Sequence, residues 1–162
     1  MNYQEKVVLL QEELNRHGIK HFTSNEVLRG WDVPEQLLFN IIPTLRILES
    51  VRNYFSIPIY VLGGYRDPEY NKAVKGAKNS LHLIFNAIDF TVGDRRKLQK
   101  IHTFLNKLDE GQLMTFRFLP KFSGNFGIGI YDSFIHLDTR SIFKRKAPAR
   151  WDKRTGNQTP IT

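Results

Sequence analysis

Residues 87–92 read Ala87-Ile88-Asp89-Phe90-Thr91-Val92, and this stretch decides the fold. It alternates as a half-buried strand does, because successive side chains of a strand point to opposite faces. Ile88, Phe90 and Val92 are core residue types and therefore predict the buried face. Asp89 is then expected on the opposite face, pointing away from the main core.

A second stretch of this kind, residues 134–138, reads Phe134-Ile135-His136-Leu137-Asp138. The same alternation turns Ile135 and Leu137 inward, so His136 and Asp138 are expected side by side on the opposite face. If the two strands are neighbours, these groups converge with Asp89. His82, seven residues before Asp89, is a further candidate for the same place.

A catalytic zinc ion takes three protein ligands and keeps a fourth position for water. His82, Asp89 and His136 provide three such ligands without any cysteine. Asp138 is then either a general base or a partner that orients an imidazole. Taken singly, each residue also fits a structural role, since a lone His beside a strand is usually hydrogen-bonded and an Asp after an apolar stretch is often a turn residue.

The order of predicted elements indicates the α+β class, with N-terminal helices packed on a small, mainly antiparallel sheet. Helices are expected first, at residues 3–16, at a capping box in residues 23–26, and over about 35–54 with a kink at Pro43. Strands and short helices follow. We expect strands at 58–62 and 87–92, a brief helix from Asp67-Pro68 to near Gly76, a helix over 94–109, and a hairpin of 127–131 with 134–138.

The composition is that of a globular chain of 162 residues, 41% hydrophobic and 25% charged, and predicts one domain over 1–162. The absence of cysteine excludes disulfides, thiolate nucleophiles and cysteine-based zinc sites. No apolar run reaches the roughly 20 residues of a membrane span. The polar N-terminus leads us to expect no signal peptide, and therefore the cytoplasm of the producing cell.

Positive charge is concentrated in a predicted basic tail that starts at about residue 140. Residues 140–162 hold seven basic residues and one acidic residue, within a formal net charge of +8 for the whole chain. Such a tail suits nucleic acid, an anionic wall polymer or a membrane surface, and charge alone does not choose among them. A solvated, partly mobile tail is an equal alternative.

The segments Gly63-Gly64-Tyr65-Arg66-Asp67-Pro68-Glu69-Tyr70-Asn71 and Gly76-Ala77-Lys78-Asn79-Ser80-Leu81-His82 precede the strand that carries Asp89. With that strand, the His136 stretch and the trailing Arg150-Trp151, they resemble the zinc D-alanyl-D-alanine carboxypeptidase family. Its pattern reads S-G-Y-R, then S-x-H-x-x-G-x-A-x-D, then a hydrophobic residue followed by H-x-D. The resemblance covers about residues 21–151.

The resemblance implies the hedgehog/DD-peptidase fold, a Zn²⁺ cofactor and a bacterial peptidoglycan peptide as substrate. It implies His82, Asp89 and His136 as zinc ligands, and Arg66 as the group that meets a carboxylate or carbonyl oxygen of the substrate. A guanidinium suits that role as a planar fork of donors, while a structural salt bridge of Arg66 with Asp67 or Glu69 is the alternative. Ser80 either contacts substrate or shapes its turn.

Aromatic residues are also placed at the cleft by the resemblance. Tyr65, Tyr131 and Trp151 are expected to line it, with ordinary packing as the alternative. The family includes many phage-encoded murein peptidases, so the resemblance implies a phage or prophage product that reaches the wall by lysis or in a particle.

Two positions depart from the family pattern. The glycine three residues after the first histidine is Phe85 here, and the acid three residues before the last histidine is Ser133, preceded by Asp132. Phe85 is expected either to distort the loop or to fill the cleft. These departures favour a second hypothesis, a structural or wall-binding virion module of the same fold. A third hypothesis, nucleic-acid binding through the cluster of Lys144-Arg145-Lys146 and Arg150, ranks lower because no nucleic-acid motif accompanies the charge.

Overall fold

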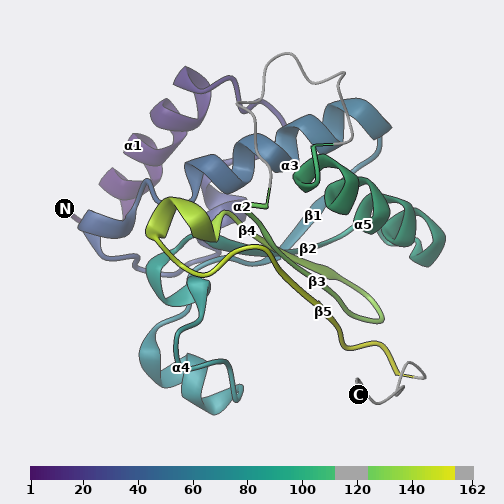
Figure 1. The fold of residues 1–162 in the computed structure, drawn as a ribbon. Helices are drawn as coiled ribbons and strands as arrows, with labels where there is room; N and C mark the ends of the chain where they lie inside the picture. Colours follow the sequence, from purple (N-terminus) through teal and green to yellow (C-terminus); the bar gives the residue numbers. More distant parts are fainter. Residues whose placement is uncertain (112–123, 156–162) are drawn as a thin grey trace.

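A computed structural model describes residues 1–111 and 124–155, and its centre is a mixed five-stranded sheet (Figure 1). The sheet order is β1-β2-β4-β3-β5. The strands are β1 (Tyr60–Gly63), β2 (Ala87–Thr91), β3 (Gly127–Ile130), β4 (Ile135–Asp138) and β5 (Ala149–Asp152). Three of the four pairings are antiparallel, and β3 with β5 is parallel. The predicted α+β class with a mainly antiparallel sheet is confirmed.

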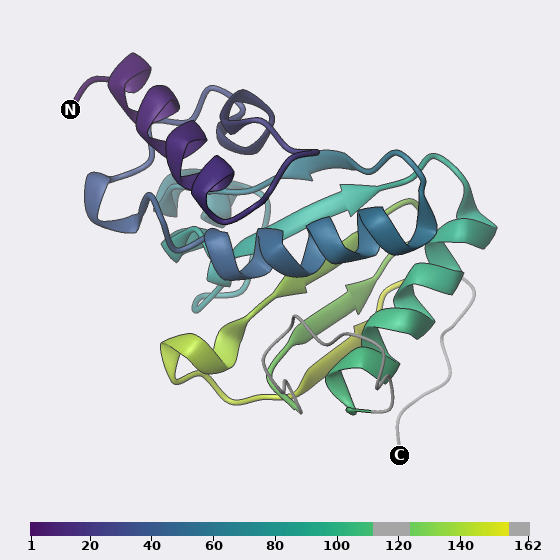
Figure 2. The same ribbon diagram turned by 90° about the horizontal axis from the view of Figure 1, so that it is seen from above.

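Helices cover one face of this sheet. The long helices α1 (Tyr3–Arg16), α3 (Ile42–Phe55) and α5 (Arg95–Asp109) lie on this side together with the short α2 (Ser24–Leu28), and Figure 2 shows α3 and α5 above the strands. The short helix α4 (Pro68–Ala73) lies on the opposite side. The sheet therefore has one face closed by helices and one face largely free for a site.

The first helices form where their capping residues predict them. Asn2 and Glu5 make a reciprocal capping box at the start of α1, and Thr23 and Glu26 make the expected one at the start of α2. The expected brief helix corresponds to α4, which Asp67 caps by accepting a hydrogen bond from the backbone N–H of Tyr70.

The predicted kinked helix over residues 35–54 is wrong. A 3₁₀ turn, η1 (Glu35–Leu37), is separated from α3 by a turn, and Pro43 lies in the first turn of α3. Proline is tolerated there because the first turn has no intrahelical acceptor for the backbone N–H that proline lacks. Pro43 therefore lies at the start of α3 instead of in the middle of a longer helix.

Residues 140–155 of the predicted basic tail contain regular secondary structure. These residues form a 3₁₀ helix, η3 (Arg140–Phe143), and the edge strand β5, which pairs with β3. Arg150 on β5 contacts the buried carboxylate of Asp109 and donates to the carbonyl of Phe126. The ion pair and the strand pairing fix this segment, although it is rich in charge. Residues 156–162 lie outside the described part of the chain.

The alternation predicted for the two central strands is confirmed. Ile88, Phe90, Ile135 and Leu137 are fully buried against the helices. Their neighbours along the strands, among them Asp89, turn to the other face. In the described residues no helix has the length and apolarity to cross a membrane.

Candidate metal centre

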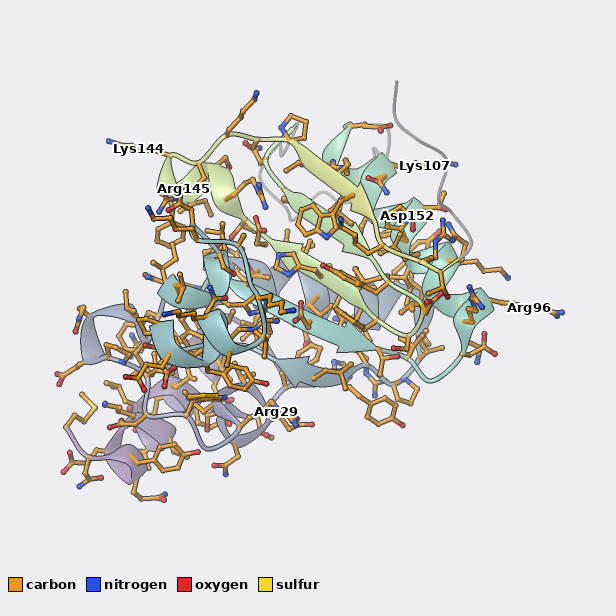
Figure 3. The ribbon with its side chains drawn as sticks, turned by 90° about the horizontal axis from the view of Figure 1, so that it is seen from below. Arg29, Arg96, Lys107, Lys144, Arg145 and Asp152 are labelled. Carbon is orange, nitrogen blue, oxygen red and sulfur yellow. The ribbon has the colours of Figure 1, made fainter. Side chains whose placement is uncertain are left out.

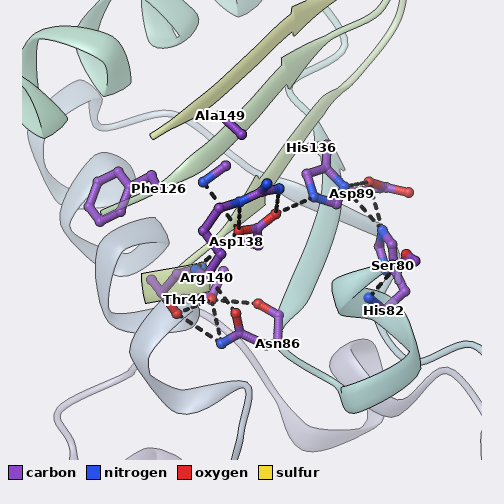
Figure 4. Close-up of polar contacts among 12 residues, drawn as sticks. Thr44, Ser80, His82, Asn86, Asp89, Phe126, His136, Asp138, Arg140 and Ala149 are labelled. Atoms are coloured by element: carbon purple, nitrogen blue, oxygen red, sulfur yellow. Dashed lines mark hydrogen bonds and ion pairs between the residues drawn. The ribbon is translucent and has the colours of Figure 1, made fainter. Parts of the chain in front are cut away.

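Three elements bring together the side chains predicted as metal ligands. Asp89 on β2 and His136 on β4 are direct partners in the antiparallel register, so their side chains leave the sheet at the same point. His82 lies in the 3₁₀ helix η2 (Leu81–Ile84). Ser80 caps this helix, because its hydroxyl oxygen accepts a hydrogen bond from the backbone N–H of His82. Figure 4 shows the three side chains in contact.

The donor atoms of this cluster are spaced as zinc ligands are. His82 Nε2 lies 3.2 Å from Asp89 Oδ1 and 3.1 Å from His136 Nδ1, and His136 Nδ1 lies 2.9 Å from Asp89 Oδ1. Tetrahedral ligands with bonds of about 2.0–2.1 Å are separated by roughly 3.3 Å. The triangle therefore needs only a small expansion to hold a metal ion, and its two nitrogens and one carboxylate oxygen fit zinc.

Each imidazole is oriented by a hydrogen bond on its other nitrogen. His82 Nδ1 lies 2.5 Å from the carbonyl oxygen of Gly64, to which it can only donate, so Nε2 carries the free lone pair. His136 Nε2 lies 2.9 Å from Asp138 Oδ2, which leaves Nδ1 toward the cluster. Histidine ligands are commonly fixed in this way by a carbonyl or a carboxylate on the second nitrogen.

Asp138 is fully buried and is held by several donors. Arg140 Nε and Nη2 bind its two oxygens at 2.9 and 2.8 Å, and the backbone N–H groups of Gly127 and Arg140 add two further bonds. Burial alone raises the pKa of this carboxyl, but the bonds from His136 and Arg140 outweigh it and lower the pKa to about 2. Asp138 is therefore a carboxylate at neutral pH.

Arg66 contacts Asp89 of the cluster, at the carboxylate oxygen that faces away from the histidines. Its Nη2 is 2.5 Å from Asp89 Oδ2, while Asp89 Oδ1 faces the histidines. The alternative partner Asp67 is instead the cap of α4. Burial opposes ionisation of Asp89, yet the hydrogen bonds from His136 and His82 hold its pKa well below the ordinary range.

The two histidines differ in their affinity for protons. Burial lowers the pKa of His82, and the hydrogen bond that its protonated ring donates to Asp89 only partly offsets this effect. Burial also acts to lower the pKa of His136, but hydrogen bonds to Asp138 and Asp89 outweigh it and raise that pKa. Of the two imidazoles in the cluster, that of His136 therefore holds its proton more strongly.

A model of the family described as peptidase M15 matches residues 12–138, most of the chain. The chain belongs to the peptidase M15 family. The resemblance to the zinc D-alanyl-D-alanine carboxypeptidases is thereby confirmed, and with it the zinc metallopeptidase class of the family. The match ends at Asp138 and includes all three residues of the cluster. None of the curated proteins compared with the chain gave a match.

The first departure from the M15 pattern, Phe85, is accommodated in the core. Its φ is 55°, in the left-handed region that a glycine would occupy without strain, and its ring is fully buried. The ring packs edge-on against Tyr65, with centroids 6.3 Å apart. Of the two alternatives for Phe85, filling the cleft is wrong, because its ring lies in the hydrophobic core and does not line the cleft.

The second departure leaves no carboxylate in the family's position. Ser133 is exposed and accepts a hydrogen bond from the Thr91 hydroxyl through its carbonyl. The preceding Asp132 accepts bonds from Arg95 and Thr155 at the surface. In the described lining of the cleft, the carboxylates are Asp89 and Asp138.

The cluster opens into a cleft of about 850 Å³. Ser80, Arg66 and Tyr131 all line it, as the resemblance implies, and their contacts with substrate stay predictions. Tyr131 stacks on Phe134 at 4.1 Å between centroids and accepts a hydrogen bond from Trp151 Nε1. Trp151 itself lies 5.0 Å from the ring of His136. One wall of the cleft is therefore aromatic.

Sequence reasoning missed the residues that make room for this wall. Gly127 and Gly129 on β3 face Asp138 and His136 across the sheet. A Cβ at Gly127 would overlap Arg140 and Asp138, and one at Gly129 would overlap the indole of Trp151. The signal was present in the Gly-x-Gly pattern, since glycine inside a strand often marks the close approach of another group.

A buried polar network beneath the cluster was also missed. Asn86, directly before β2, donates to Thr139 Oγ1 at 2.8 Å and accepts from the Thr139 backbone, and the Thr44 hydroxyl donates to the Asn86 carbonyl at 2.7 Å (Figure 4). These bonds join α3 to the ends of β2 and β4. They hold together the strands that carry Asp89 and His136 of the cluster.

Proposed function

We propose that this protein is a zinc-dependent peptidase that cleaves the stem peptide of bacterial peptidoglycan. The observation that carries the proposal is the His82–Asp89–His136 triangle, whose donor atoms lie within 4.8 Å of one another at the base of a cleft. Zinc held there would acidify a bound water and polarise a peptide carbonyl. The family match supports peptide hydrolysis as the reaction class.

The protein's own residues have separable tasks in this proposal. Arg66 lines the cleft with one nitrogen on Asp89, and we assign its remaining donors to the oxygen of the scissile carbonyl. We assign Asp138 to orienting His136, in place of the general-base alternative. Its contacts with Arg140 and two backbone N–H groups support this, since they occupy the lone pairs that a base would need.

The test is release of new amine ends from purified peptidoglycan by the zinc-loaded protein. His136→Ala should abolish release, because two ligands hold zinc poorly. His17→Ala is the matched control, since His17 is the exposed C-cap residue of α1, beside Glu13, and its loss should leave release unchanged. Equal release by wild type and His136→Ala would refute the proposal.

A second candidate function, binding of wall peptide without cleavage, is favoured by one observation. The two carboxylates described in the cleft, Asp89 and Asp138, are both engaged by arginine and histidine. Zinc-loaded protein that sediments with peptidoglycan but releases no amines would establish this function. The phage or prophage origin and delivery by lysis or in a particle stay predictions, as does the absence of specific nucleic-acid binding.

A further inference from the structure

A second lobe of the cleft, of about 420 Å³, adjoins the metal cluster at Arg66 and Asp89. We call it the β1 lobe, because Leu62 and Gly63 of the edge strand β1 line it. Its other walls include Trp31 and Tyr65, whose rings meet edge-on at 6.2 Å between centroids, and Arg29. This lobe has no role in the proposal above.

The larger lobe reaches the other edge of the sheet. Ala149, Trp151 and Lys153, on or next to the edge strand β5, line it, and we call it the β5 lobe. Figure 3 looks onto this face, with Arg29 beyond β1 at one side and Asp152 on β5 at the other. The two lobes share Arg66, Tyr70, Asp89 and Phe134. The cleft therefore crosses the sheet from edge to edge, with the ligand strands β2 and β4 in the middle.

Arg66 lies where the lobes meet and not at one end of the cleft. A carboxypeptidase needs a cation that stops the substrate one residue beyond the scissile bond, by pairing with the terminal carboxylate. Here the lining continues past Arg66 on both sides. A substrate chain that passes the metal cluster thus meets a wall of side chains in either direction.

The charges of both lobes suit an acidic chain. Arg29 lies in the β1 lobe, and Lys75 and Lys153 lie in the β5 lobe. Within residues 1–111 and 124–155, none of these three cations has an ion-pair partner; Arg29 donates to the carbonyl of Val61. Unpaired cations at both ends of a cleft attract carboxylates along a bound peptide.

We propose that the two lobes hold one acidic peptide chain on both sides of the bond that is cut, so that the protein is an endopeptidase and not a carboxypeptidase. The proposal rests on the peptidase function above and specifies its substrate. Trp31 and Tyr65 contact the part of the chain in the β1 lobe. Trp151 contacts the part in the β5 lobe.

The protein's two tryptophans give one fluorescent reporter in each lobe. Trp151→Phe leaves Trp31 to report on the β1 lobe, and Trp31→Phe leaves Trp151 to report on the β5 lobe. The probe is a synthetic peptide of stem composition, acetylated at its N-terminus and amidated at its C-terminus, added to zinc-free protein. It should change the emission of both reporters, while a peptide shortened at one end should change one. An unchanged Trp31 signal with the long peptide would overturn the proposal.

Cleavage by zinc-loaded protein gives the second readout. The doubly blocked peptide should be cut, and Trp31→Ala should lower kcat/KM for it at least tenfold while changing the value for one of the shortened peptides less than twofold. Leu62→Ala, at a 45% exposed position, serves if Trp31→Ala does not fold. Tyr54→Ala, on α3 and outside both lobes, is the control and should act as wild type.

The outcomes separate this inference from the function on which it rests. Cleavage of peptides with a free C-terminus but not of the doubly blocked peptide would overturn the endopeptidase assignment and leave the peptidase function standing. Failure to cut any peptide, or purified peptidoglycan, would overturn both.

Discussion

Gly129 on β3 lies directly beneath the indole of Trp151 on β5, and a Cβ at Gly129 would overlap three atoms of that ring. The two residues are partners in the parallel register of β3 and β5. The indole in turn lies against His136, so the absence of one side chain determines where the aromatic wall of the metal centre lies.

Gly129→Ala should therefore lower the free energy of unfolding by about 1–3 kcal/mol through overpacking, and should weaken zinc binding as the indole moves. Chemical denaturation of the zinc-free protein measures the first effect. The cause is tested in a double-mutant cycle, because Gly129→Ala should cost almost nothing in a Trp151→Ala background. An equal loss in both backgrounds would mean that the strand backbone, and not the ring, rejects the methyl group.

The Asp138→Asn variant tests whether Asp138 orients His136 or acts as a general base. Because the amide replaces the charged acceptor of His136 Nε2, zinc affinity should fall about 10–100-fold. Activity at saturating zinc should fall much less. Zinc competition with a chromophoric chelator, together with kcat at saturating metal, provides the measurement. Unchanged zinc affinity with kcat lost would instead identify Asp138 as the general base.

Zinc should stabilise the protein more as the pH rises. The raised pKa of His136 adds stability to the metal-free protein below the ordinary value of 6.5, and this is lost as pH rises through the folded-state pKa. Zinc needs the deprotonated ring, so its affinity increases over the same interval. The difference in Tm with and without zinc should therefore grow from pH 6 upward. A difference that shrinks over this interval would contradict the raised pKa.

The Phe85→Gly variant should be more stable than the Phe85→Ala variant, although alanine usually destabilises a protein less than glycine does. Both variants lose a buried ring, which should lower the free energy of unfolding by about 3–5 kcal/mol. Only glycine removes the strain of the left-handed backbone conformation at φ 55°, which costs other residues about 1 kcal/mol. Urea unfolding should thus rank wild type above Phe85→Gly and Phe85→Gly above Phe85→Ala. The metal site should survive in both, because Phe85 does not line the cleft.

Arg150→Met should destabilise the protein by about 3 kcal/mol, because it leaves the buried carboxylate of Asp109 without its cation. Lys146→Met, on the exposed segment before β5, is the control and should change stability by less than about 0.5 kcal/mol. Urea unfolding of both variants makes the comparison. Equal, small effects would restore the view of residues 140–155 as a tail.

The sequence predicted well what depends on local alternation. Ile88 and Phe90 fixed the inner face of β2, and Ile135 and Leu137 fixed that of β4, so the positions of Asp89 and His136 followed. The family match and the donor spacing support the metal centre that this alternation indicated.

The elements that sequence reasoning missed depend on distant partners. β5 is short and half-exposed, and its place is set by pairing with β3 and by Asp109, about 40 residues earlier in the chain. The role of Asp138 does not follow from alternation, because its partner Arg140 lies beyond the end of β4, in η3, where the strand pattern no longer predicts the direction of a side chain. The role of Pro43 does not follow from the sequence alone, because a proline kinks a helix or starts one depending on where the preceding turn ends.

The pairing of β5 with β3 also has a consequence for the order of synthesis. All three metal donors have left the ribosome once residue 136 has emerged, but the strand that walls one side of the cleft follows more than a dozen residues later. A nascent chain thus contains the three residues of the candidate metal centre before it contains the β5 wall of the cleft. The β5 side of the cleft, with Trp151, is therefore completed after the β1 side.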